Sequence, residues 1–299
     1  MHTQELSRRR FLAAGSLATA ALATGCATGP APVGTGPSFK GPVGLQLYSL
    51  RALFPRDVPG TVQKVAGYGI REVELAGTYN FKPEAFRDLL LKAGLDPVSQ
   101  HVGFDRLEKE PAKVAAEAKL LGLRYTGCAA IPHKGAFDAP QASRAAKVLN
   151  EAGKVFRDQG LRCFYHCHGF EFRPDSGGAG KMAMDVLIQE TDPALVSFQM
   201  DVMWVQFPGQ DPAAWLLKYP GRWHLMHLKD LKKGVATGSH SGGTDPNNDV
   251  VLGTGQMNWP VILAAAKKSG VRHYFIEDES MDAADHIPLS LQYLSQVRF

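Results

Sequence analysis

The stretch Phe164-Tyr165-His166-Cys167-His168-Gly169-Phe170-Glu171 is a short apolar run that ends in two imidazoles and a carboxylate. Three later stretches have the same form, an apolar run that ends in a metal-binding side chain: residues 198–201, 224–227 and 274–277. Each run has the length of a buried strand and precedes a helix-like segment. In a barrel of parallel strands, side chains at the carboxyl ends of neighbouring strands converge on one mouth. Because carboxylates and imidazoles gathered there suit manganese, zinc or iron, the pattern indicates a metal-dependent enzyme.

Strand and helix patterns alternate along the chain from residue 43 onward. Apolar runs bounded by turn residues predict eight strands, at 43–48, 70–75, 95–101, 123–129, 161–167, 195–201, 223–228 and 271–277. Apolar residues at three- and four-residue spacing predict helices between them, most clearly at 111–121, 141–159 and 259–269. Repeated strand–helix units require a parallel sheet with right-handed crossovers. We therefore expect an α/β fold, a (β/α)8 TIM barrel over residues 43–299, rather than an open doubly wound sheet.

Composition and charge limit the partners of the chain. Its 299 residues are 44% apolar and 21% charged, which is typical of a globular protein large enough for one barrel. The formal net charge is +4, of which Arg8, Arg9 and Arg10 against Glu5 contribute +2, so the remainder carries only +2. This balance predicts no nucleic-acid partner. A small-molecule partner is expected, and the oligomeric state is left open.

The first 26 residues predict an export signal. Paired arginines followed by Phe11 and Leu12 resemble a twin-arginine signal, and the apolar segment 11–23 is too short for a membrane span. Leu22 to Cys26 resembles a bacterial lipoprotein processing site in which Cys26 is acylated, with the leucine one position early. Cleavage by the ordinary signal peptidase is the alternative.

The segment 27–42 is rich in Gly, Pro, Ala and Thr, which predicts a flexible tether between the signal and the barrel. We therefore expect an exported protein, either periplasmic or anchored to the membrane as a lipoprotein. A lipid at Cys26 would be its only contact with the membrane.

Residues Tyr165 to Phe172 resemble the "YHNHxxEF" segment of the sugar phosphate isomerase/epimerase family. The similarity continues in four further stretches, at residues 46–51, 200–205, 227–230 and 253–259. That family has the xylose isomerase-like barrel that is shared with endonuclease IV. The resemblance covers residues 43–299, and it implies a TIM barrel with a divalent metal at its mouth and a carbohydrate-like substrate.

Asp201, His227 and Glu277 are the expected metal ligands, since each follows directly on an apolar strand pattern. The alternatives are a turn cap for Asp201 and a solvated acidic loop for Glu277. The fourth ligand is open between His166 and Glu171, because relatives with a Glu on the fifth strand use it to bind metal. With Glu171, the oxygen-rich set favours Mn²⁺, our first choice, or Mg²⁺. With His166, the set favours Zn²⁺, Fe²⁺ or Co²⁺ and leaves Glu171 as general base, the role that we favour slightly.

Further polar side chains at the predicted mouth are assigned to substrate or catalysis. Glu74 and His101 end the second and third strand patterns, and with Gln46 we expect them to bind sugar hydroxyls. A buried and internally paired side chain is the alternative for Glu74 and His101. His168 is expected to touch the substrate and to act in catalysis.

Lys229 and Trp204 complete the predicted site. Strand alternation aims Lys229 the same way as His227, where it can stabilise an oxyanion or act as an acid once a cation lowers its pKa. A surface charge is the alternative for Lys229. Trp204 suits stacking on a sugar ring, and packing in the core or rim is equally compatible with the sequence.

These residue types predict an isomerase or epimerase acting on a sugar or keto sugar. A cation chelated by a carbonyl and a neighbouring hydroxyl acidifies the adjacent C–H and holds the enediolate, while a carboxylate or imidazole such as Glu277, Glu171 or His168 takes the proton. Expulsion of a β substituent would instead make the protein a dehydratase or 3-keto-glycoside eliminase. A non-catalytic carbohydrate-binding lipoprotein is the remaining alternative, and it should lack Asp201, His227 or Glu277.

Overall fold

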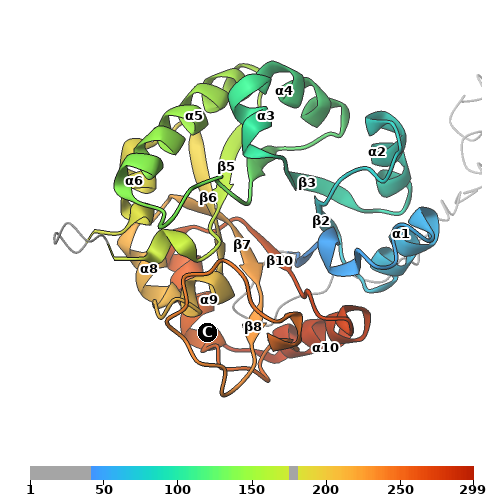
Figure 1. The fold of residues 1–299 in the computed structure, drawn as a ribbon. Helices are drawn as coiled ribbons and strands as arrows, with labels where there is room; N and C mark the ends of the chain where they lie inside the picture. Colours follow the sequence, from blue (N-terminus) through green and yellow to red (C-terminus); the bar gives the residue numbers. More distant parts are fainter. Residues whose placement is uncertain (1–41, 175–180) are drawn as a thin grey trace, which may run out of the picture.

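Eight parallel strands close into a barrel in the computed structural model, which describes residues 42–174 and 181–299 (Figure 1). Around the barrel the order is β1-β10-β7-β6-β5-β4-β3-β2. The bounds of these strands are β1 Gly44–Gln46, β2 Glu72–Leu75, β3 Asp96–His101, β4 Tyr125–Cys128, β5 Arg162–His166, β6 Val196–Asp201, β7 Trp223–Leu228 and β10 His273–Ile276. The predicted signal, residues 1–26, and nearly all of the predicted tether lie outside the described residues.

The helices form a ring outside the barrel (Figure 1). Their bounds are α1 Val58–Gly67, α2 Pro83–Lys92, α3 Phe104–Lys109, α4 Pro111–Leu120, α5 Ala139–Asp158, α6 Ala183–Glu190, α7 Val202–Gln206, α8 Pro212–Lys218, α9 Trp259–Ser269 and α10 Ala283–Gln296. Proline stands in the first turn of six of them, in α1, α2, α4, α5, α8 and α9, where its missing N–H costs no hydrogen bond. None of the helices among the described residues is long and apolar enough to cross a membrane.

The eight predicted strands and the three predicted helices are confirmed. The first strand pairs in parallel with both β10 and β2, so the sheet is closed and the open-sheet alternative is wrong. One pair of strands was not predicted: β8 Asp230–Leu231 and β9 Asp249–Val250 form a short antiparallel ribbon after β7. Two-residue strands are too short to produce a periodic signal, so this ribbon has no signature in the sequence.

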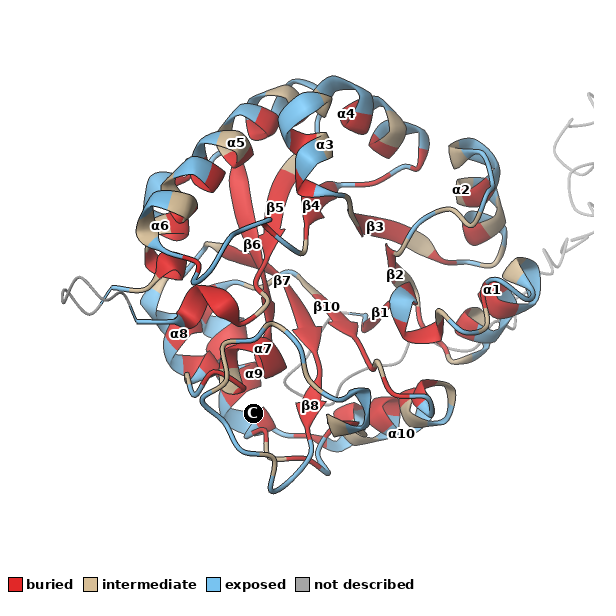
Figure 2. Ribbon diagram, in the orientation of Figure 1, coloured by how far each residue is buried: buried red, intermediate tan, exposed pale blue. Residues whose placement is uncertain are grey.

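Side chains alternate between two cores along each strand. Phe164 points into the barrel and packs with four residues of other strands, namely Val98, Tyr125, Leu225 and Phe275. Its neighbour Tyr165 belongs to the larger core between the strands and the helices. Figure 2 shows the result, with strands buried along their length and helices buried on one face only. The next residue, His166, is therefore turned back toward the barrel interior.

Candidate metal centre

Asp201, His227 and Glu277 come together at the carboxyl ends of three adjacent strands. Asp201 is opposite His227 in the register of β6 and β7, and Glu277 directly follows β10, the next strand. His227 Nδ1 lies 2.9 Å from Glu277 Oε2 and 3.7 Å from Asp201 Oδ2. One ligand atom from each of the three lies within 4.8 Å of the others, and all three side chains are buried. Two carboxylates and one imidazole form a donor set that fits Mn²⁺, Fe²⁺, Co²⁺ or Zn²⁺.

The two oxygens of Asp201 have different surroundings. Oδ1 caps α7 by accepting hydrogen bonds from Met203 N at 2.9 Å and Trp204 N at 3.1 Å. Oδ2 is buried and has no hydrogen-bond partner among the described residues. A buried carboxylate oxygen without a hydrogen bond is costly, so a cation beside His227 and Glu277 fits the position well. Asp201 therefore serves as the predicted turn cap and leaves one oxygen available as a ligand.

The ring of His227 is oriented from its other side by a carboxylate. Its Nε2 lies 2.6 Å from Glu74 Oε1, while its Nδ1 faces Asp201 and Glu277. Histidine ligands usually donate their second N–H to such a partner, which sets the tautomer and the ring orientation. Burial lowers the pKa of His227, but the surrounding carboxylates raise it well above its usual value. The acidic pocket is thus strongly attractive to a positive charge.

Both carboxylate oxygens of Glu74 are saturated with hydrogen bonds in this arrangement. Its Oε1 accepts hydrogen bonds from Gln46 Nε2 at 2.7 Å and from His227, and its Oε2 accepts from Ser99 Oγ at 2.6 Å and Gln199 Nε2 at 2.8 Å. Four donors use the lone pairs of a carboxylate. Burial raises the pKa of Glu74, but His101, His227 and the hydrogen bonds outweigh it and lower the pKa to about 2. The geometry therefore supports the paired alternative for Glu74 and not the binding of sugar hydroxyls.

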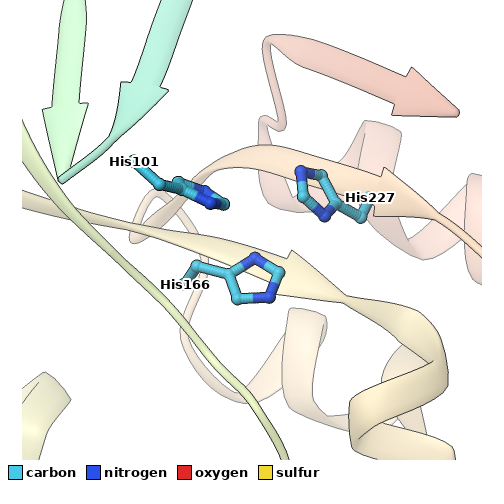
Figure 3. A group of neighbouring side chains, drawn as sticks. All are labelled: His101, His166 and His227. Carbon is cyan, nitrogen blue, oxygen red and sulfur yellow. The ribbon is translucent and has the colours of Figure 1, made fainter. Parts of the chain in front are cut away.

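A second imidazole group adjoins the first and shares His227 with it. His101, His166 and His227 offer ligand atoms within 4.8 Å of one another, and Figure 3 shows their rings turned toward one another. His101 Nε2 and His166 Nδ1 both approach Gln199 Oε1, at 2.8 Å and 3.0 Å. Since Gln199 Nε2 donates to Glu74, its Oε1 must accept, so both histidine nitrogens donate. His166 Nε2 is left with a free lone pair, as a metal ligand requires.

A cavity of about 400 Å³ opens over this group. The predicted site residues in its wall are Gln46, His101, His166, His168 and Glu277. Tyr48 and Glu279 also line it and were not predicted. Burial lowers the pKa of His168, so this ring is neutral and able to accept a proton at neutral pH.

Lys229 and Trp204 lie behind the cavity wall. Lys229 forms an ion pair with Glu279, and its Nζ lies 3.5 Å from Glu277 Oε2 and 3.6 Å from Asp249 Oδ2. Burial lowers the pKa of Lys229, yet these carboxylates outweigh burial and hold the pKa well above its usual value in the metal-free protein. Trp204 packs against His168 with ring centroids 4.6 Å apart. The geometry supports positioning roles for both residues, and for Trp204 the core alternative.

Glu171 is not brought to the cavity. It is buried, and its carboxylate accepts hydrogen bonds from the Tyr165 hydroxyl and from His168 N at 2.9 Å. Tyr165 faces the outer core, and Gly169, at φ 99°, turns the chain in the left-handed region just before Glu171. The predicted roles of Glu171 as ligand or general base thus have no support in this geometry. Burial raises the pKa of Glu171 to about 7, although its hydrogen bonds oppose the shift.

The stability of the protein is expected to depend on pH through Glu171. Its pKa rises from 4.5 to about 7 on folding, so the contribution to stability is complete below the lower value and is lost as pH rises through the higher one. The loss should be about 2.5 kcal/mol between about pH 5 and about pH 8. Glu171→Gln stays neutral, and denaturant unfolding should show it free of this dependence. Glu151→Gln, on an exposed helix face, should keep the wild-type profile; identical profiles for Glu171→Gln and wild type would contradict the assignment.

Several residues of the site were missed from the sequence. They are Tyr48, Ser99, Gln199, Asp249 and Glu279. A signal existed for Gln199, which lies two residues before Asp201 on the same strand and so faces the same side. No sequence signal existed for Asp249, because it lies near Lys229 only as a result of the β8–β9 ribbon, which was not predicted.

The sequence pattern of the xylose isomerase-like TIM barrel family matches residues 62–296. The chain belongs to this family. Its fold is similar to a sugar phosphate isomerase/epimerase from Parabacteroides distasonis, with a TM-score of 0.73 and 23% identity over 85% of this chain and 93% of that one. It is also similar to the IolI protein with a bound zinc atom, with a TM-score of 0.65 and 11% identity over 84% and 95% of the two chains.

Curated relatives match a shorter part of the chain. An inosose dehydratase of Clostridium tetani is 34% identical over 90 residues, which are 30% of this chain and 28% of the relative. The match therefore spans less than a third of the relative's length. The family is one of enzymes, and it includes both isomerases or epimerases and dehydratases.

Proposed function

We propose that this chain is a divalent-metal-dependent enzyme that removes a proton from the carbon beside the carbonyl of a keto sugar or cyclic keto polyol. The observation that carries the proposal is the buried Oδ2 of Asp201, which accepts no hydrogen bond from the described residues and lies beside His227 and Glu277. These three side chains would hold the metal, and His166 would complete the set through its free Nε2. When bound, the metal would polarise the carbonyl and so acidify the neighbouring C–H.

Two side chains, His168 and Lys229, have the remaining roles in the proposed reaction. His168 lines the cavity as a neutral imidazole, so it is the proposed proton acceptor. Delivery of a proton to the opposite face of the same carbon by a second group gives an epimer, and return of the proton by His168 to the neighbouring carbon gives an isomer. Lys229 keeps Glu277 and Glu279 in place and neutralises part of their charge.

A dehydratase is the second candidate, favoured by the similarity to inosose dehydratases. The first step is the same, removal of the proton by His168. The hydroxyl on the next carbon then leaves with a proton as water, and an α,β-unsaturated ketone remains. The two candidates are distinguished by their products. An isomerase or epimerase gives a product of the same composition as the substrate, apart from the exchanged hydrogen, whereas a dehydratase gives a product that has lost water and absorbs in the ultraviolet.

Replacing His168 by Gln is expected to lower the rate of C–H exchange by at least about 100-fold while metal content stays at the wild-type level. His166→Gln should instead lose metal, because it removes a proposed ligand. The measurements are deuterium incorporation from solvent into a panel of inososes and keto sugars, and metal analysis of the same protein. His133→Gln, an exposed histidine outside the cavity wall, serves as the control. Undiminished exchange in His168→Gln would assign the base elsewhere.

A further inference from the structure

The face of the barrel opposite the metal centre carries a one-sided set of cations. Because the strands are parallel, their amino ends and the carboxyl ends of the surrounding helices all lie on this face. We define the basal arc as six exposed cations there: Lys64, Lys92, Lys119, Lys267, Lys268 and Arg272. None of them forms an ion pair with a carboxylate within residues 42–174 and 181–299.

The arc follows the barrel from the end of α9 to the end of α4 and leaves out the part covered by α5, α6 and α8. It runs from α9 and β10 past β1 to α1, α2 and α4, and Figure 1 shows α1 and α2 across the barrel from α5 and α6. On that other side Glu190 and Asp192 are exposed, and the basic residues in the last turns of α5 and α8, Arg157 and Lys218, are paired with Asp158 and Asp185. A helix dipole favours a cation at every helix carboxyl end, which would give a uniform ring. The dipole therefore accounts for cations on both sides, and the sides differ in whether carboxylates neutralise them: Arg157 and Lys218 are paired, and the cations of the basal arc are not.

The chain leaves the barrel in the middle of this arc. The described part begins at Pro42, which is exposed and immediately precedes β1, and β1 lies between β10 and β2. The predicted acylated residue Cys26 is sixteen residues earlier, a separation that at most about 55 Å of chain can span. The chain therefore joins the barrel on the face that carries the basal arc, and an anchor at Cys26 would be attached to that face.

We propose that the basal arc docks on an anionic lipid surface and points the catalytic cavity away from it. Unpaired lysines and arginines near such a surface each strengthen adsorption about fivefold, within the short range that salt allows. Electrostatic attraction also strengthens membrane binding by a lipid anchor, because an acyl chain and a basic patch together bind more stably than either alone. The proposal rests on the position of the charges and does not depend on the proposed reaction.

The test compares three full-length proteins that differ only in where four cations are neutralised. The basal variant carries Lys92→Gln, Lys267→Gln, Lys268→Gln and Arg272→Gln. The matched control carries Lys82→Gln, Lys134→Gln, Lys232→Gln and Lys233→Gln, which are exposed positions on the cavity side of the barrel. Both variants lose the same net charge, and both keep residues 1–41, so any contribution of that segment is the same in all three.

Partition is measured by co-sedimentation with vesicles of phosphatidylcholine, with and without about one third phosphatidylglycerol. The wild type should prefer the anionic vesicles at about 0.05 M salt and lose most of that preference at about 0.5 M. The basal variant should bind them at least about tenfold more weakly, and the control should stay within about twofold of wild type. Circular dichroism confirms that each variant is folded. Equal losses in the two variants, no loss in the basal variant, or equal binding of the wild type to neutral vesicles would overturn the proposal.

Discussion

Replacing Asp201 by Asn is expected to remove the bound divalent metal and to lower turnover by at least about 100-fold. Loss of a residue that only supports a ligand costs 10- to 100-fold, so loss of a ligand should cost at least as much. The substitution is selective because Asn keeps an oxygen that can cap α7 while it removes the negative charge and the unpartnered Oδ2. Metal analysis after dialysis, together with the exchange assay, provides the measurement.

The matched control for this variant is Asp211→Asn. Asp211 caps α8 through Ala213 N at 2.8 Å but lies outside the metal group, so its replacement should leave metal content and turnover unchanged. His227→Gln and Glu277→Gln should resemble Asp201→Asn. A stoichiometric metal that persists in all three ligand variants would place the site elsewhere and refute the proposed function.

Replacing Glu74 by Gln is expected to weaken metal binding by about 10- to 100-fold and to destabilise the protein by about 3 kcal/mol. The amide would lose the charge that faces His227, and its NH₂ group would point at donors that now bond to a carboxylate. Metal affinity is measured by competition with a chelating dye, and stability by denaturant unfolding of the metal-free protein.

Glu72→Gln is the matched control for this effect. It is the same change two residues earlier on β2, at the opposite end of the barrel, where Glu72 pairs with His273 and Arg124 near the surface. Partly exposed pairs contribute little, so the control should lose less than about 1 kcal/mol and no metal affinity. If Glu74 bound the substrate directly, Glu74→Gln would raise KM and leave metal affinity unchanged, and that outcome would contradict the positioning role.

The fold was predictable because its signals are local. Apolar runs of strand length, helical periodicity and the turn residues between them defined eight strand–helix units, and no long-range contact was needed to count them. Residues that follow such a run, among them Asp201, His227 and Glu277, must lie at the mouth of a parallel barrel. Their convergence was therefore predictable once the strands were assigned, whereas their role as ligands stays a prediction.

Glu171 shows where this reasoning stops. It lies beyond the end of β5, where side-chain alternation no longer applies, and the turn at Gly169 sends it toward Tyr165 in the outer core. Glu74 shows a second limit, since its place at the mouth was predicted but its partners were not. A carboxylate that binds substrate and one that is saturated by Gln46, Ser99, Gln199 and His227 look identical in the sequence.

The sequence by itself determined the barrel, the strand ends that meet at its mouth and the family to which the chain belongs. Only the tertiary structure decided which polar groups at that mouth remain available: one oxygen of Asp201, one nitrogen of His166 and the ring of His168. The physical reason is that strand periodicity is a property of neighbouring residues. Hydrogen-bond saturation, by contrast, is set by side chains up to 153 positions apart in the chain, as in the pair of Glu74 and His227.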